Sequence, residues 1–139
     1  PLEPREVARN QIHLAHVLTE KSELEAAERL YGESIAALEA RGADAQARID
    51  LADALAGLAE LHFRAGRYPD AEPLLRRVLD IRRERLPEGD PAIADALEEL
   101  GLNQFDQGNF EQAEAHLREA LAMRRAALGM RPTRRWPRT

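Results

Sequence analysis

A repeating unit of about 42 residues is the feature that most limits the folds open to this chain of 139 residues. Residues 52–55 read Ala-Asp-Ala-Leu and recur at residues 94–97, a shift of 42. The same shift aligns Leu58 with Leu100, Gly66 with Gly108, Tyr68 with Phe110, Ala71 with Ala113 and Leu79 with Leu121. A more divergent copy lies 44 residues upstream and carries Ser22 where the others have glycine. Three copies predict a protein in which each repeat packs on its neighbours.

Each copy has the apolar spacing of two helices. In the second copy, one stripe is Leu51, Leu55, Leu58, Leu61 and His62, and the other is Leu74, Leu75, Val78, Leu79 and Ile81. The pattern predicts helices at residues 5–20, 23–40, 45–64, 68–86, 91–106 and 110–128. We therefore expect an all-α fold, a solenoid of six helices in three repeats. The repeats span residues 1–46, 47–90 and 91–130, and a basic tail follows at residues 131–139.

Small residues stand where two helices of a repeat must approach closely. They are Ala15, Ala59 and Gly101 in the first helices and Ala27, Ala71 and Ala113 in the second helices. A larger side chain at these positions is expected to force the pair apart.

These residues resemble the tetratricopeptide repeat (TPR), whose pattern has Leu-Gly or Leu-Ala in the first helix, then a glycine turn, an aromatic residue and Ala-Glu. The second copy matches with Leu58, Ala59, Gly66, Tyr68, Ala71 and Glu72, and the third with Leu100, Gly101, Gly108, Phe110, Ala113 and Glu114. The resemblance covers about residues 5–128 and implies a right-handed α-solenoid of three helix-turn-helix repeats.

The repeat is longer here than the usual ~34 residues. This long form is similar to the kinesin-light-chain subfamily and its bacterial relatives, which implies binding of extended peptides or partner domains. Several such relatives flank kinases, proteases or ATPases, so we expect a module of a larger, bacterial protein. The paired Asn residues of that subfamily are replaced by Ile12-His13, Ala56-Gly57 and Glu98-Glu99, and its cargo specificity does not carry over.

Composition argues against several other classes of protein. The chain has no Cys, which excludes disulfides and favours a cytoplasmic location. It has no apolar run of about 18 residues and no signal peptide, so no membrane association is expected. The net charge is -5, and leaving out Arg131, Arg134, Arg135 and Arg138 gives -9 for residues 1–130. An acidic body argues against nucleic-acid binding, which requires a basic surface.

Stacked helix pairs present their first helices on a concave face, which is the surface that such repeats use for binding. The helical period places these candidate groove residues there: Arg9, Ile12, His16, Asp53, Glu60, Phe63, Arg64, Glu98, Leu102, Phe105 and Asp106. Phe63 and Phe105 are the candidate anchors, although both are equally explained as packing residues. The carboxylates favour a neutral or basic ligand, and their alternative is a merely solvated helix face.

No pattern typical of catalysis is present. The sequence lacks a glycine-rich phosphate loop and a nucleophile paired with a base, and its carboxylates alternate with arginines as surface ion pairs. His13 and His16 are three residues apart, with Glu20 one turn further, but zinc needs three or four well-placed ligands. We expect no enzyme activity, no cofactor and no metal. His62 is expected in the core and His116 at the surface.

The third repeat has no obvious cap after Leu128. The open end favours a truncated array or self-association, such as a homodimer through this repeat, while the Pro- and Arg-rich tail is expected to be disordered or to dock in an acidic groove. The leading function is a protein- or peptide-binding adaptor. The alternative is a structural or regulatory segment that mediates homo-oligomerisation or intramolecular contacts without a separate client.

Overall fold

The computed structural model describes residues 3–129, and this part of the chain consists of six helices without a strand. They are α1 (Pro4–Glu20), α2 (Leu24–Glu39), α3 (Ala45–Arg64), α4 (Tyr68–Arg85), α5 (Pro91–Asp106) and α6 (Phe110–Ala127). Every boundary lies within one residue of the predicted range, and the all-α class is confirmed. The tail at residues 131–139, with its predicted disorder, lies outside the described residues.

Local sequence explains where these helices begin and end. The Asp44 and Asp90 side chains accept hydrogen bonds from the backbone N–H groups of Ala47 and Ala92, at 3.1 and 2.9 Å, and so cap α3 and α5. Gly66 and Gly108 follow these helices with φ of 77° and 83°, a conformation that favours glycine. Ser22 adopts the same left-handed conformation, with φ of 65°, at the equivalent turn of the first repeat.

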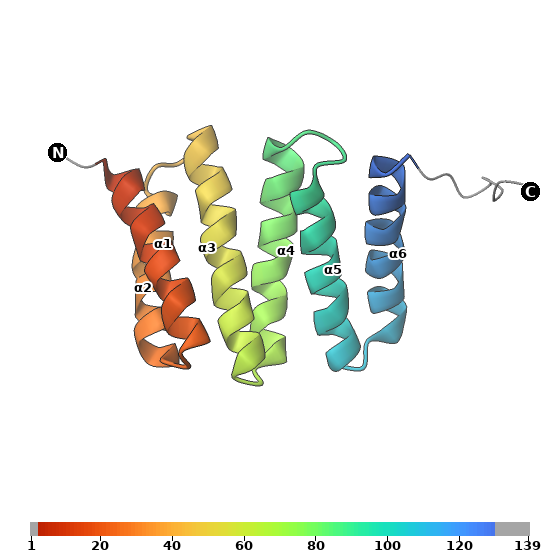
Figure 1. Ribbon diagram of the computed structural model, residues 1–139, viewed down its shortest axis with the longest axis horizontal. Coiled ribbons are helices and arrows are strands. Elements are labelled where there is room, and N and C mark those ends of the chain that lie inside the picture. The colour runs from red at the N-terminus through yellow and green to blue at the C-terminus, as the bar shows by residue number, and fades with distance from the viewer. Residues whose placement is uncertain (1–2, 130–139) are drawn as a thin grey trace, which may run out of the picture.

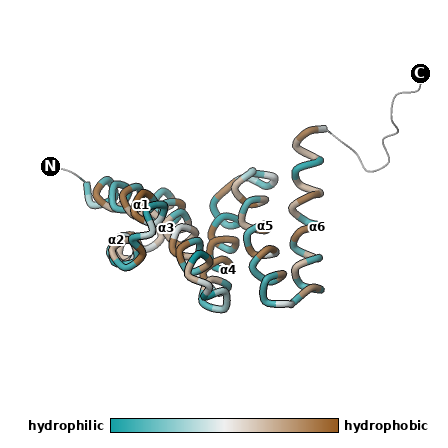
Figure 2. The backbone as a smooth tube through the Cα atoms, turned by 60° about the horizontal axis from the view of Figure 1, so that its bottom comes forward, coloured by the Kyte–Doolittle hydropathy of each residue, from teal (hydrophilic) through white to brown (hydrophobic). Residues whose placement is uncertain are grey.

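The helices form a single row of antiparallel pairs (Figure 1). Within each repeat the two helices pack together, and α2 and α4 also pack on the first helix of the next repeat. The helix axes change direction steadily from α1 to α6, which is the twist of a solenoid (Figure 2). Among residues 3–129 no helix is long and apolar enough to cross a membrane.

The core lies along the two predicted stripes. Leu51, Leu55 and Leu61 are fully buried, as predicted. His62 is only half-buried, and its Nδ1 accepts a hydrogen bond from Arg67 Nε. The prediction of an exposed His116 is wrong, because the His116 ring packs back toward α5, where its Nδ1 lies 2.7 Å from the Gln104 side-chain amide.

The small residues lie where the helices touch, as predicted. A Cβ atom added at Gly101 would stand 2.8 Å from Leu117 Cγ of the partner helix. Ala15, Ala27, Ala59, Ala71 and Ala113 are all buried.

Replacing Ala71 with leucine is therefore expected to lower the free energy of unfolding by about 1–3 kcal/mol, because the fully buried site has no room for three more carbons. Thermal unfolding followed by circular dichroism measures the loss. Ala115→Leu, at an exposed position of α6, is the matched control and should melt like the unaltered chain. Equal melting temperatures for the two variants would contradict this packing.

Candidate functional site

A small groove, which we call the Phe63 groove, lies between the first helices of the second and third repeats. It is lined by Ala59, Glu60 and Phe63 from α3, Leu75 from α4, and Glu99 and Leu102 from α5, and its volume is about 130 Å³. Glu60 and Phe63 are three residues apart on α3, as are Glu99 and Leu102 on α5, so each pair shares one helix face. The structure thus brings together Glu60, Phe63 and Leu102 among the predicted groove residues.

Three lining residues were not on the predicted list. Ala59 was predicted at the helix contact and Leu75 on the buried stripe. Both of these residues reach the floor of the groove. Glu99 lies one turn before Leu102. The signal that could have found them is the repeat register, because it places Leu75 of α4 beside the first helix that follows it.

The preceding junction has different side chains at the positions that line the groove. At the preceding junction the equivalent positions include Tyr31 in place of Leu75 and Gly57 in place of Glu99. The Tyr31 ring is fully buried, and its hydroxyl lies 2.9 Å from His16 Nδ1. We attribute the open groove to the smaller Leu75, since the large ring occupies the corresponding space between α1 and α3.

Phe63 is half-buried. On one side the Phe63 ring packs against the ring of Tyr68. The two ring centroids are 4.9 Å apart, and the rings have a T-shaped arrangement. The remainder of the ring faces the groove, where Leu102 is 46% exposed. The Phe63 side chain therefore both packs against Tyr68 and lines the groove, so packing and ligand contact do not exclude each other.

The groove is acidic. Desolvation raises the pKa of Glu99; nearby Arg82 opposes this rise, whereas Asp95, Glu60 and Glu98 add to it. Glu60 accepts a hydrogen bond from Arg64 Nε at 3.0 Å, so part of its charge is neutralised.

Further predicted groove residues are held by other partners. Arg9 contacts Asp50 at 3.1 Å, His16 contacts Tyr31, Arg64 bridges Glu20 and Glu60, Asp53 contacts Arg82 at 3.4 Å, and Glu98 contacts Arg124 at 3.0 Å. Desolvation raises the pKa of Asp53, and Arg82 opposes that rise. The Asp106 side chain is exposed at the end of α5.

The placement of Ile12 at the surface is wrong. Ile12 is 4% exposed because it shares a stripe of α1 with the buried residues Ala8, Ala15 and Thr19, which faces the rest of the array.

The two candidate anchors lie in different hollows. Phe105 is 55% exposed and lies 5.6 Å from Phe110, between ring centroids. Together with Leu117 and Leu121 these rings line a more open hollow on α5 and α6. It is the equivalent of the Phe63 groove one repeat later, without a following helix among the described residues.

Within residues 3–129, no three His, Asp or Glu side chains gather as a metal site would require.

Comparison with known proteins agrees with this architecture. Residues 50–126, more than half of the chain, match the tetratricopeptide repeat family. No curated protein matches the sequence closely enough to count as a relative.

Solved structures show the same fold. BtubC (BKLC) from P. vanneervenii is 27% identical, with a TM-score of 0.80 over 96% of this chain and 52% of its own. The TPR domain of Arabidopsis FLU is 18% identical, with a TM-score of 0.74 over 86% of this chain and 96% of its own.

The TPR-like repeats of a Podosopora anserina protein described as a kinesin light chain are 19% identical, with a TM-score of 0.77 over 96% of this chain and 61% of theirs. This chain thus spans about half the length of BtubC. The predicted likeness to kinesin-light-chain repeats is confirmed at the level of fold. The chain belongs to the tetratricopeptide repeat family.

Proposed function

We propose that this chain is a protein- or peptide-binding adaptor module that takes its ligand along the first helices, with one apolar ligand side chain in the Phe63 groove. Tetratricopeptide repeats generally mediate protein–protein interactions and are typically non-enzymatic scaffolds. The observation that carries the proposal is a groove lined by the apolar side chains of Phe63 and Leu102 beside two carboxylates, Glu60 and Glu99.

The dimensions and the charge of the groove support a particular ligand chemistry. Its volume of about 130 Å³ is close to the ~150 Å³ of an engineered apolar cavity that holds benzene. One aliphatic or aromatic side chain therefore fits. The carboxylates favour basic residues on either side of that side chain, since complementary charges raise the rate and the specificity of association.

Synthetic peptides that carry one Leu flanked by arginines are expected to bind more tightly than peptides with the same Leu flanked by glutamates. Phe63→Ala should weaken the binding of the Arg-flanked peptide about tenfold or more, as truncation of a central aromatic contact does. Fluorescence anisotropy with labelled peptides measures both effects. Equal affinities for the two peptides would refute an acidic groove as the binding site.

The pH dependence tests the role of Glu99. Because its pKa is raised, its charge is lost at a higher pH than that of an ordinary Glu, and affinity for the Arg-flanked peptide should fall as the pH passes down through this range. Glu99→Gln should weaken binding at neutral pH without lowering stability, since the folded chain holds the Glu99 proton more tightly than the unfolded chain does and the ionised form costs stability. Glu84→Gln, an exposed position of α4 outside the groove, is the matched control.

A second candidate is self-association through the third repeat, which the exposed apolar residues of α6 favour. Leu128 is 76% exposed, and Phe110 and Leu121 are also open to solvent. A dimer through this surface would show as a rise in mass with concentration in sedimentation equilibrium. A mass that stays at that of the monomer up to high micromolar concentration would rule out self-association, and the adaptor function would remain as the single candidate.

A further inference from the structure

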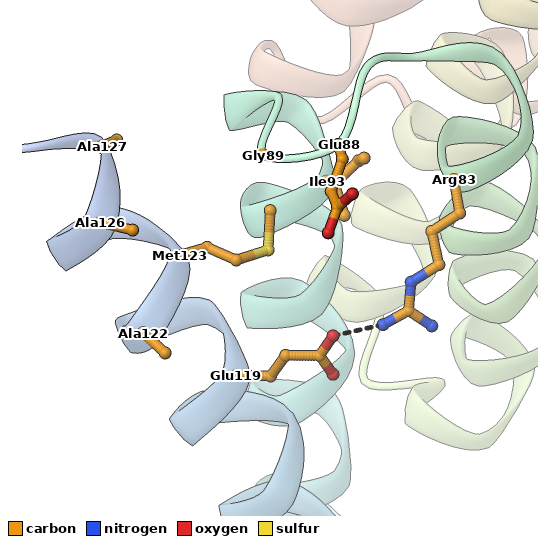
Figure 3. Close-up of a pocket in the computed structure, with 9 residues that line it drawn as sticks. All are labelled: Arg83, Glu88, Gly89, Ile93, Glu119, Ala122, Met123, Ala126 and Ala127. Atoms are coloured by element: carbon orange, nitrogen blue, oxygen red, sulfur yellow. Dashed lines mark hydrogen bonds and ion pairs between the residues drawn. The ribbon is translucent and has the colours of Figure 1, made fainter.

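A second groove lies at the C-terminal end of the array, away from the Phe63 groove. It runs between α6, the α4–α5 connection and the start of α5, and its volume is about 790 Å³ (Figure 3). Its apolar wall includes Ile93, Met123 and Ala126, and its charged residues are Arg83, Glu88 and Glu119. We call it the end groove.

We attribute the open end groove to a difference in sequence between α6 and α4 in the last two turns of each helix. Three lining alanines, Ala122, Ala126 and Ala127, stand at the positions that Asp80, Glu84 and Arg85 occupy in α4. The replacement of three charged side chains by methyl groups leaves an apolar, solvent-exposed helix face. Met123 is also less buried than its counterpart Ile81.

We propose that residues 130–139 of this chain occupy the end groove, with Trp136 against the α6 alanines and Met123, and with arginines beside Glu88 and Glu119. The inference is independent of the proposed function. The segment starts at the groove itself, because Gly129 follows the lining residue Ala127 by two positions, and its φ of 71° ends α6 in the left-handed conformation.

The length of the segment suits this placement. The seven residues that follow Gly129, up to and including Trp136, span up to roughly 23–25 Å when extended. The groove residues of α6, from Glu119 to Ala127, cover about 12 Å of helix. A segment of this length is long enough for Trp136 to contact any part of the groove wall that α6 contributes.

Charge and side-chain chemistry favour the same occupant. Arg131, Arg134, Arg135 and Arg138 carry four positive charges, and the groove offers two carboxylates against one guanidinium. That guanidinium, Arg83, is already paired with Glu119 at 2.6 Å, which leaves the groove net negative (Figure 3). An indole ring supplies a large apolar surface and makes favourable contacts with a methionine sulfur.

The fluorescence of Trp136 tests the proposal, because it is the only Trp of the chain. In the complete 139-residue chain, its emission should be blue-shifted and less quenched by acrylamide than in a synthetic peptide of residues 129–139. Ala126→Arg places a long cationic side chain in the groove and should shift the emission to that of the peptide. Ala115→Arg, exposed on α6 outside the groove, should leave it unchanged, and both variants should keep their helix content because arginine is a good helix former.

Other results of the same measurements would overturn the proposal. The placement is overturned if Trp136 in the complete chain emits and is quenched as in the peptide, or if Ala126→Arg and Ala115→Arg have equal effects. A blue shift that grows with protein concentration would place the segment on a second copy and overturn the intrachain contact.

Discussion

Replacing Gly57 with alanine is expected to lower the free energy of unfolding by about 1–3 kcal/mol, even though alanine favours a helix over glycine by up to about 1 kcal/mol. A Cβ atom at Gly57 would stand 2.5 Å from Tyr31 Cε1 and 2.6 Å from the Tyr31 hydroxyl oxygen. The Tyr31 ring is fully buried, so either the ring must leave its present position or the helices α2 and α3 must move apart. Urea unfolding followed by circular dichroism measures the loss.

Two further variants separate crowding from helix propensity. Gly32→Ala lies in α2 with nothing within 4 Å of the new Cβ atom, and it should stabilise the chain by about 0.5–1 kcal/mol. Tyr31→Leu restores the side chain that the second repeat has at this position. In the Tyr31→Leu background, the cost of Gly57→Ala should disappear, a coupling that a double-mutant cycle detects. An unchanged cost there would show that the two residues do not collide.

Replacing both Arg5 and Arg9 with methionine is expected to cost roughly 3 kcal/mol, because the Asp50 carboxylate would remain buried without a counter-charge. The Asp50 side chain is 2% exposed, and its two oxygens lie 2.6 Å from Arg5 Nε and 3.1 Å from Arg9 Nη1. The two arginines tie the first turns of α1 to α3. Thermal and urea unfolding report the loss.

The control for this prediction is a substitution that removes the charge of Asp50. Adding Asp50→Asn to the Arg5→Met and Arg9→Met variant should recover part of the stability, since a neutral amide costs less to bury than a carboxylate. Arg29→Met, at an exposed position of α2, should change stability by less than about 0.5 kcal/mol. If Asp50→Asn brought no recovery, the arginines would stabilise the chain through packing alone.

Local signals were sufficient to predict the helices. Gly66 and Gly108 end α3 and α5, aspartates cap α3 and α5, and the 42-residue register places the small residues at the helix contacts. The caps and turns depend on neighbours within about one helical turn, and the register follows from the repetition of the sequence. The same period predicted the first-helix surface on which Glu60, Phe63 and Leu102 meet.

Contacts between repeats were not predictable in this way. A helical period tells which residues share a face but not how far the neighbouring repeat wraps around that face. Ile12 was consequently placed at the surface although it is buried, and Asp50 was not recognised as the centre of an ion-pair cluster. We attribute the open groove to the difference between Tyr31 and Leu75, two residues of second helices that pack against the first helix of the next repeat.

By itself, the sequence determined the repeat, the six helices and the acidic character of the first-helix surface, because these follow from residues close along the chain. Only the tertiary structure decided that Phe63 and Phe105 lie in separate hollows and that Glu99 joins Phe63 in one groove. It also decided that three alanines leave an open end groove on α6. The physical reason is that a groove is the space left between packed side chains of several helices, and its size depends on all of their volumes together.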